Sequence, residues 1–235
     1  MSSIFRFKHF VINQENASLK VGTDAMILGA FCLNQTAKTA LDVGTGTGVL
    51  SLMVAQTHPE LIIDALDIDP QNCTLAKHNV ANSQFSERIN VVCQDIFDFN
   101  PIKKYDLIFS NPPFHVDSLK SNEKRISKSK HFTEIEFASF IQKLSTLLSE
   151  NGKFFMIFPA ENLSVVKIHL ENHDFFINEI INVYGKPNLK KRVITVCSKI
   201  PTELKEIDFL IRDSSEGYSK EYIEKTKHFH GTDLG

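Results

Sequence analysis

The sequence predicts an α/β fold built on an open, mostly parallel sheet with helices on both faces. Between residues 37 and 200, short apolar runs of strand length alternate with longer segments of helical periodicity, an order typical of a parallel sheet. Four of the apolar runs end on glycines, acids or an Asn-Pro turn. Parallel strands bring their carboxyl ends to one edge of a sheet, and ligands bind outside that edge. The pattern therefore predicts one site there.

The composition indicates one large domain, or one domain with an appendage. The chain has 235 residues, of which 42% are hydrophobic and 19 are Phe, enough to bury a core. No apolar run is long enough to span a bilayer, and the first residues do not resemble a signal peptide. Four scattered Cys and nine His lack metal-ligand spacing, so we expect the reducing cytoplasm and no metal. Because the net charge is −2, any nucleic-acid contact must come from local patches.

The first segment predicts an extended edge strand followed by a short helix. It interleaves aromatic with basic residues, namely Phe5, Arg6, Phe7, Lys8, His9 and Phe10. An apolar helix follows within residues 19–31, with Thr23 or Asp24 as its cap and Gly22 permitting a tight entry. The free N–H groups at such a helix start suit a carboxylate, although a capped packing helix is the simpler interpretation.

A glycine-rich turn joins a strand to a helix at Leu41-Asp42-Val43-Gly44-Thr45-Gly46-Thr47-Gly48. Such a turn lets the backbone come close to a ligand. The dinucleotide fingerprint is not matched, because Val49 stands where its third glycine belongs, and no Gly-Lys-Ser/Thr phosphate loop follows. With Asp42 inside it, the turn suits an ammonium or hydroxyl group better than a pyrophosphate. The pattern D-x-G-x-G-x-G therefore indicates a nucleoside site.

The next two strands, expected within residues 61–70 and 89–96, end on acids. Asp67 follows the glycines by about twenty residues, the spacing at which a carboxylate accepts both ribose hydroxyls. Asp69 is better placed to cap the helix expected over residues 71–82. Asp95 closes the second strand and is placed to accept an adenine amino group, with Ile96 packing on the ring.

The fourth strand, Asp106–Ser110, stops on Asn111-Pro112-Pro113-Phe114. Two prolines fix φ and remove two backbone donors, so this turn is stiff. The amide oxygen of Asn111 and the carbonyl of Pro112 are placed to accept the two hydrogens of a planar NH2 group, while the Phe114 ring covers its face. Adenine, cytosine and a carboxamide all carry such a group. The alternative is an ordinary Asn-Pro turn.

Alternation continues in the second half of the chain. Elements are expected at residues 137–148 (helix), 153–158 (strand) and 163–170 (helix). Two late strands, within residues 175–184 and 192–197, are close enough to pair antiparallel at the sheet edge. The tail from residue 204 to 235 shows no clear pattern.

Two basic clusters are candidates for phosphate binding, although a solvated surface is the usual explanation of a charge run. The first follows the Asn-Pro-Pro-Phe turn and comprises Lys120, Lys124, Arg125, Lys128 and Lys130. The second comprises Lys190, Lys191 and Arg192.

Taken together and in order, the motifs across residues 42–114 resemble the class I S-adenosylmethionine-dependent methyltransferases that act on amino groups. A narrower resemblance, nearly end to end, is to the bacterial tRNA1(Val) adenine-N6 methyltransferases. It rests on Phe5-x-Phe7-Lys8-x-Phe10, Lys20-Val21-Gly22-Thr23-Asp24, Ile211-Arg212-Asp213 and Tyr218-Ser219-x-x-Tyr222. Two features depart from this family: Phe114 stands where Tyr is common, and the ending from His230 to Gly235 is unusual.

The resemblance implies a Rossmann-like class I methyltransferase fold with a seven-stranded, mostly parallel sheet and an antiparallel edge strand. It divides the chain into an amino-terminal extension that closes over the cofactor (1–36), a methyltransferase domain (37–200) and a carboxyl-terminal appendage (201–235). It implies S-adenosylmethionine as cofactor and tRNA as partner of a monomeric, cytoplasmic enzyme that needs no membrane and no metal.

The resemblance also assigns roles to the residues singled out above. The cofactor-binding residues are expected to be Lys20, Gly22, Thr23, Asp24, Asp42, Gly44, Gly46, Gly48, Asp67, Asp95, Ile96 and Asn111. The catalytic residues, which hold the target base, are expected to be Asn111, Pro112 and Phe114. The two basic clusters are expected to hold RNA phosphates.

The implied reaction is methyl transfer to the exocyclic N6 of an adenine in tRNA, the one beside the anticodon of tRNA1(Val). One alternative is a protein glutamine-N5 methyltransferase, because a carboxamide presents the same NH2 group. Such enzymes usually carry an additional amino-terminal helical domain, whereas only about 36 residues precede the first predicted strand here. The second alternative is a non-catalytic S-adenosylmethionine-binding subunit, which would have no need of an intact Asn111–Phe114 turn.

Overall fold

The computed structural model describes residues 3–15, 17, 20–33, 36–112 and 134–231. Its strands are β1 (Ile4–Arg6), β2 (Val11–Asn13), β3 (Thr39–Val43), β4 (Ile62–Asp67), β5 (Ile89–Cys93), β6 (Tyr105–Ser110), β7 (Leu148–Pro159), β8 (Phe176–Lys186), β9 (Leu189–Ser198) and β10 (Lys205–Leu210). Its helices are α1 (Thr23–Phe31), α2 (Val49–Thr57), α3 (Pro70–Ala81), α4 (Glu134–Leu147), α5 (Leu163–Glu171) and α6 (Lys220–Thr226), with single 3₁₀ turns at Ser86–Arg88 and Ala160–Asn162.

The main sheet confirms the predicted α/β fold and corrects its strand count. Its order is β10-β8-β9-β7-β6-β3-β4-β5, eight strands rather than seven, and β9 alone among the described strands of this sheet runs antiparallel to its neighbours. The additional strand is β10, which comes from the tail and pairs parallel with β8. The tail had shown no strand pattern because five of the six residues of β10 are exposed or only partly buried. The hairpin of β8 and β9 pairs antiparallel as predicted, but β10 occupies the edge beyond it.

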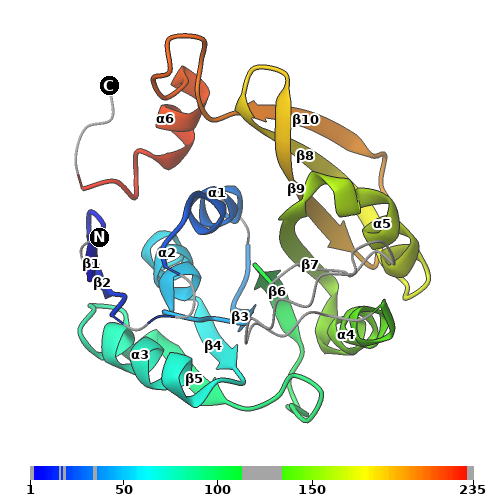
Figure 1. Cartoon of the computed structure of the whole chain (residues 1–235). Coiled ribbons are helices and arrows are strands. Elements are labelled where there is room, and N and C mark those ends of the chain that lie inside the picture. The colour runs from blue at the N-terminus through cyan, green and yellow to red at the C-terminus, as the bar shows by residue number, and fades with distance from the viewer. Residues whose placement is uncertain (1–2, 16, 18–19, 34–35, 113–133, 232–235) are drawn as a thin grey trace, which may run out of the picture.

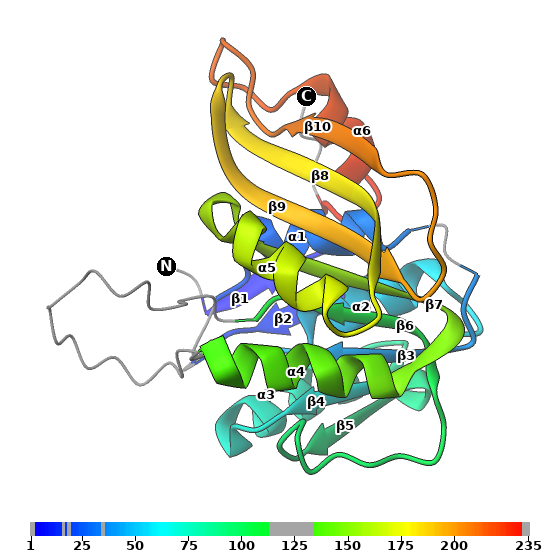
Figure 2. The same ribbon diagram turned by 90° about the vertical axis from the view of Figure 1, so that its right-hand side faces the viewer.

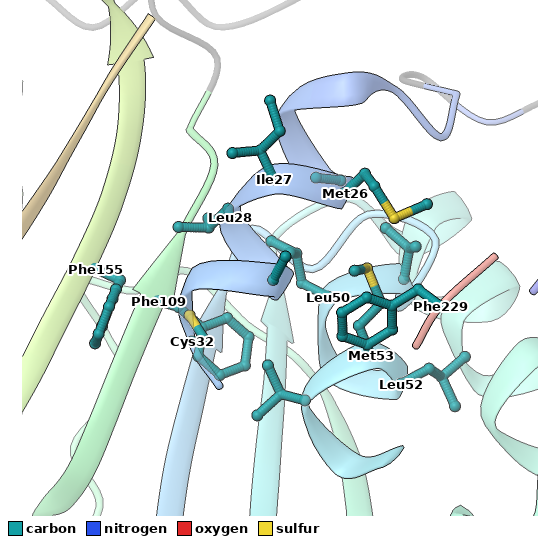
Figure 3. Packing of buried hydrophobic residues seen from close by; sticks show 14 of the residues in the cluster. Met26, Ile27, Leu28, Cys32, Leu50, Leu52, Met53, Phe109, Phe155 and Phe229 are labelled. Carbon is teal, nitrogen blue, oxygen red and sulfur yellow. The ribbon is translucent and has the colours of Figure 1, made fainter. Parts of the chain in front are cut away.

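Helices cover both faces of the sheet (Figures 1 and 2), and each face buries its own apolar cluster. On one face lie α1, α2, α3 and α6, with α6 against α1 and β10; on the other lie α4 and α5. Figure 3 shows Met26 and Leu28 of α1 near Leu50 and Met53 of α2. The two helices lie close because Gly29 faces Met53: a Cβ built on Gly29 would come within 2.6 Å of the Met53 methyl carbon.

Two helix starts show how local sequence and tertiary contacts compete. Asp69 caps α3 as predicted, with its Oδ1 accepting from the Gln71 N–H at 2.8 Å. The cap of α1 is instead Gly22, with no side-chain hydrogen bond, rather than Thr23 or Asp24. Asp24 lies in the first turn of α1, where its carboxylate accepts a hydrogen bond from Arg192.

The amino-terminal segment is extended as predicted, but it pairs outside the main sheet. Strands β1 and β2 form a separate antiparallel pair. The ring of Phe7 stacks on Phe10 with centroids 4.4 Å apart, and both are buried. The Lys8 N–H donates to the Phe229 carbonyl at 2.9 Å, so this segment packs against the end of the tail.

The tail contributes to the hydrophobic core through Phe209 of β10, and substituting this residue tests that contribution. Its ring is 1% exposed and meets Phe31 edge-on at 5.1 Å. Replacing Phe209 with Ala removes a fully buried ring and leaves a cavity, so we expect the free energy of unfolding to fall by about 3–5 kcal/mol in urea denaturation.

The matched control is Ile207→Ala on the same strand, because Ile207 is 37% exposed. We expect this control to cost less than about 1 kcal/mol. Equal costs for the two substitutions would show that β10 is not part of the cooperative core.

Candidate active site

The predicted site lies at the carboxyl edge of four adjacent parallel strands. The last residue of β3, Val43, is in register with Leu66 of β4 and with Ser110 of β6. Asp67, the last residue of β4, is in register with Cys93 of β5. The Ser110 hydroxyl also donates to the Val43 carbonyl at 2.8 Å. The segments that follow these strands therefore begin side by side.

The glycine-rich turn after β3 needs its glycines for backbone conformation. Gly44, Gly46 and Gly48 have φ of 77°, 56° and 80°, a region in which other L-residues are strained. A Cβ on Gly44 or Gly46 would meet no atom of the described residues within 4 Å, whereas one on Gly48 would contact Ala76 at 3.5 Å. The first two glycines thus border open space, and the third borders α3.

Asp67 holds this turn in place. Its Oδ2 accepts from the Gly46 N–H at 2.8 Å, and its Oδ1 accepts from the Asp69 N–H at 2.9 Å. The Asn72 amide donates weakly to both oxygens at 3.3 Å. The carboxylate is 6% exposed, so these bonds give it one orientation. A further donor pair could take the place of the long Asn72 bonds.

Asp42 is buried beneath the turn, and one of its oxygens is unsatisfied. Its Oδ2 accepts from the hydroxyls of Thr45 and Ser51, both at 2.7 Å, while Oδ1 has no hydrogen-bond partner among the described residues. Burial raises the pKa of Asp42 to about 6, although the two hydroxyls act in the opposite direction. A carboxylate in this state is suited to a nearby cation.

Asp95 and Ile96 follow β5, next to the end of β4. The Gln94 N–H donates to the Asp67 carbonyl at 3.0 Å, which ties the two strand ends together. Asp95 is partly exposed, and its Oδ1 accepts from the Phe97 N–H at 3.1 Å. Ile96 is also partly exposed. This arrangement leaves an acid and an aliphatic side chain at the same edge as Asp67.

Asn111 and Pro112 directly follow β6, with Asn111 partly exposed and Pro112 buried. The remaining residues predicted around this turn lie outside the described residues, namely Phe114, Lys120, Lys124, Arg125, Lys128 and Lys130. The described geometry therefore covers the two proposed acceptors and not the proposed stacking ring.

The amino-terminal and late basic residues come together at the start of α1. Lys20, Gly22 and Thr23 are exposed there. The Asp24 carboxylate accepts from Arg192 Nε at 2.8 Å, so a predicted cofactor residue pairs with a predicted RNA-binding residue.

The other two residues of the second basic cluster are Lys190 and Lys191. Lys190 donates to the Asn182 side chain at 3.3 Å, and Lys191 is exposed. These residues begin β9, whose amino end meets the carboxyl end of β7 through the pairing of Arg192 with Pro159. The cluster therefore lies at the same edge of the sheet as Asn111.

Asn79 of α3 is a positioning residue that the sequence analysis missed. Its amide donates to the Thr47 carbonyl at 2.8 Å and to the Asn13 carbonyl at 2.9 Å, and it accepts from the Asn13 N–H. It thereby links the amino-terminal hairpin to the glycine-rich turn. The available signal was an Asn on the buried face of a helix, beside Ala76 and Val80.

The described part of the chain shows neither a metal site nor a membrane span. No group of three or more His, Cys, Asp or Glu side chains there is arranged to hold a metal ion. No described helix combines the length and apolar character needed to cross a membrane.

The raised pKa of Asp42 predicts a pH-dependent stability. In the unfolded chain the pKa of this group is near the ordinary value of 3.8, and in the fold it is about 6. The folded state therefore binds the proton more tightly. This contribution to the free energy of unfolding is complete below about pH 4 and is lost as the pH rises through 6, a decrease of about 3 kcal/mol. The measurement is the free energy of unfolding as a function of pH for the wild type and for Asp42→Asn. The difference between the two curves should show this decrease.

Asp64→Asn is the matched control. Burial alone would raise the pKa of Asp64, but hydrogen bonds from Lys103, Tyr105 and Asn90 outweigh it and lower the pKa. Its difference curve should show no decrease between pH 4 and 6. A flat difference curve for Asp42→Asn would contradict the raised pKa.

Comparison with known proteins agrees with the geometry. The family model of the methyltransferase small domain matches residues 17–173. A tRNA1(Val) (adenine(37)-N6)-methyltransferase of Bacteroides thetaiotaomicron is 34% identical over 96% of both chains. One from Pedobacter heparinus is 40% identical over 84% of both.

Solved structures agree on the fold. A predicted O-methyltransferase from Agrobacterium tumefaciens superposes with a TM-score of 0.69 at 16% identity, covering 88% of this chain and 96% of that one. A putative RNA methyltransferase from Pyrococcus horikoshii has a TM-score of 0.54 at 17% identity, covering 75% and 81%. The fold and the glycine-rich turn agree with the sequence identity of 34–40% to these relatives over 84–96% of the chain. The chain therefore belongs to the family of tRNA1(Val) (adenine(37)-N6)-methyltransferases.

Proposed function

We propose that this protein transfers a methyl group from S-adenosylmethionine to the exocyclic N6 of an adenine in tRNA, the adenine beside the anticodon of tRNA1(Val). The observation that carries the proposal is the position of Asn111 and Pro112. They follow β6 directly, and β6 lies beside the strand that carries the glycine-rich turn. The names of the relatives that match 84–96% of the chain support the choice of substrate.

The residues at the strand ends fit S-adenosylmethionine. Gly44 and Gly46 border open space that a Cβ would enter. The Asp67 carboxylate has bonds from Asn72 that are long enough for a ribose diol to replace. The unpartnered oxygen of Asp42 suits the positive charge of the cofactor. We infer that Asp95 and Ile96 receive the adenine, and that Lys20 to Asp24 lie over the methionine end.

The reaction needs the protein mainly for orientation. The bound cofactor supplies an electrophilic methyl group on its sulfonium. An adenine amino group is a weak nucleophile because its lone pair is delocalised into the ring. The Asn111 amide oxygen and the Pro112 carbonyl would accept its two hydrogens, draw them out of the ring plane and so localise the lone pair on the nitrogen, which is a positioning and electrostatic contribution. Asn111 remains neutral, and the proton leaves to water after transfer.

The remaining roles follow from the same substrate. We infer that Phe114 stacks on the target base, at a gain of about 1–3 kcal/mol, which offsets the cost of unstacking that base. We infer that the two basic clusters hold RNA phosphates. We also propose that residues 1–36 act as an extension over the cofactor and that the enzyme is a cytoplasmic monomer.

Methylation by the purified protein tests the proposed reaction. After incubation with S-adenosylmethionine and tRNA lacking N6-methyladenosine, mass spectrometry of the nucleosides should detect N6-methyladenosine. Asn111→Ala should lower turnover at least about a hundredfold, because it removes an acceptor that orients the amino group, and should lower cofactor affinity far less, because the other expected cofactor-binding residues stay in place. If the intact protein binds the cofactor and yields no N6-methyladenosine, the proposed substrate is wrong.

A matched pair of glycines tests the cofactor site. Gly44→Ala and Gly48→Ala introduce the same strained backbone, which costs about 1–2 kcal/mol in each. We expect Gly44→Ala to lower the affinity for S-adenosylmethionine by about tenfold or more and Gly48→Ala to lower it much less, because the methyl group on Gly44 enters the open space while that on Gly48 contacts Ala76. Calorimetric titration of both variants measures this. Equal loss of affinity in the two variants would contradict the assignment.

A further inference from the structure

A cationic cleft lies at the carboxyl edge of the sheet, beyond β6 on the side of β8, β9 and β10. Its volume is about 330 Å3, and its walls include Thr23, Asp24, Gly185, Lys191, Arg192 and Arg212. It draws on three parts of the chain far apart in sequence: the start of α1, the β8–β9 hairpin and the segment after β10, which lie near one another in Figure 1. Neither the glycine-rich turn nor Asn111 contributes to it.

The charge of the cleft is positive. The described residues that line it include three cationic side chains and one carboxylate, and the carboxylate, Asp24, is bound to Arg192. Among the described residues, no carboxylate forms an ion pair with Lys191 or Arg212. Two nearby acids have other partners: Glu216 pairs with Lys186 at 2.6 Å, and Asp213 accepts from the backbone and hydroxyl of Ser215. The positive charge is therefore available to a ligand.

Arg212 is held in place by the segment that precedes α6. Its guanidinium lies over the Tyr218 ring at 4.5 Å, and Tyr218 in turn stacks on Tyr222 at 4.7 Å and 13°. Arg212 Nη1 also donates to the Glu216 carbonyl at 2.7 Å. A guanidinium fixed in this way loses little entropy on binding and keeps its other N–H groups for an anion.

The turn that carries Arg212 is anchored at both ends. The Ile211 N–H donates to the Tyr184 carbonyl of β8 at 2.9 Å, and the Ser219 N–H donates to the Ile211 carbonyl at 2.9 Å. The Ser219 hydroxyl donates to the Leu210 carbonyl and accepts from the Tyr222 N–H as the cap of α6. The tail residues that the family resemblance singled out therefore build a support for one arginine.

The distance to the proposed target site suits RNA. Lys191 on β9 lies two strands from β6, about 10 Å at ordinary strand spacing, and Arg212, which follows β10, lies four strands from it, about 19 Å. This range corresponds to phosphates within a few nucleotides of one held at Asn111. Arg is well matched to phosphate because its planar fork presents paired donors. Since the whole chain carries a net charge of −2, attraction to RNA must come from such a local site.

We propose that this cleft binds a phosphodiester of the tRNA substrate within a few nucleotides of the target, with Arg212 and Lys191 as the direct contacts and Tyr218 as the positioning residue for Arg212. This inference rests on the proposed function for the identity of the RNA. The pairing of Arg192 with Asp24 then connects the RNA contact to the start of α1.

Salt-dependent binding tests the cleft. The affinity of an unmodified tRNA1(Val) transcript is measured by fluorescence anisotropy over a series of salt concentrations for the wild type, Arg212→Gln and Lys205→Gln. Both variants lose one positive charge. Lys205 is exposed at the opposite end of β10, roughly 20 Å away. We expect Arg212→Gln to bind several-fold more weakly and to reduce the slope of log affinity against log salt by about one, with Lys205→Gln close to the wild type.

Further variants separate a contact from a structural effect. Tyr218→Phe keeps the ring under Arg212 and should retain the wild-type salt slope, whereas Tyr218→Leu should reproduce the reduced slope of Arg212→Gln. In methylation assays Arg212→Gln should raise KM for tRNA and leave kcat within about twofold. Should Arg212→Gln fail to fold, Lys191→Gln takes its place, since the Lys191 side chain is exposed.

The outcomes distinguish this inference from the proposed function. Equal affinities and slopes for Arg212→Gln and Lys205→Gln would overturn the cleft as a phosphate site, even if the wild type methylates the transcript. A reduced slope for Arg212→Gln alone would support the cleft, even if the wild type forms no N6-methyladenosine. A reduced slope together with no N6-methyladenosine would overturn the proposed reaction but would still show that the cleft binds RNA.

Discussion

The candidate active site depends on hydrogen bonds between the glycine-rich turn and the end of β4. Three glycines at positive φ form this turn, and its backbone N–H groups bond to acceptors outside it. Gly44 and Thr45 donate to the Leu66 carbonyl, and Gly46 donates to the Asp67 carboxylate. Buried backbone donors need such partners. Because the end of β4 also accepts from the segment after β5, any shift in the parallel register would separate the acids from the glycines. The register of the sheet is thus the constraint that assembles the site.

Much of this arrangement could be predicted because its signals are local. A strand that ends on Asp67, a cap at Asp69 and glycines at alternate positions are each visible within ten residues, and parallel pairing then brings the strand ends together. The missed strand, β10, has a different origin. It joins the edge with one buried side chain, Phe209, and its other residues face solvent or are only partly covered, so neither alternation nor an apolar run could identify it.

The contacts that escaped prediction join residues distant in sequence. Asn79 bonds to backbone 66 and 32 positions away, and Asp24 pairs with a partner 168 positions away. Each of these residues has an ordinary local interpretation, as a helix residue or a helix cap, and only the fold reveals its partner. The Asp24–Arg192 pair is about one third exposed on each side, so it adds about 0–1 kcal/mol at most. The ion pair connects the start of α1 to β9 and so helps to fix the position of α1 relative to that strand.

Asp42 shows why the site should be less stable than the surrounding core. Its burial without a full set of hydrogen bonds opposes ionisation, and at neutral pH the fold nevertheless holds it mainly as a carboxylate, since its pKa is about 6. A purely structural position would favour an uncharged side chain, because a buried charge without a partner is destabilising. A cationic ligand that stabilises the charged form of Asp42 offsets the free-energy cost of ionising this buried group. By linkage, that gain becomes part of the ligand's affinity. A destabilising carboxylate at a turn that borders open space is therefore better explained by ligand binding than by packing.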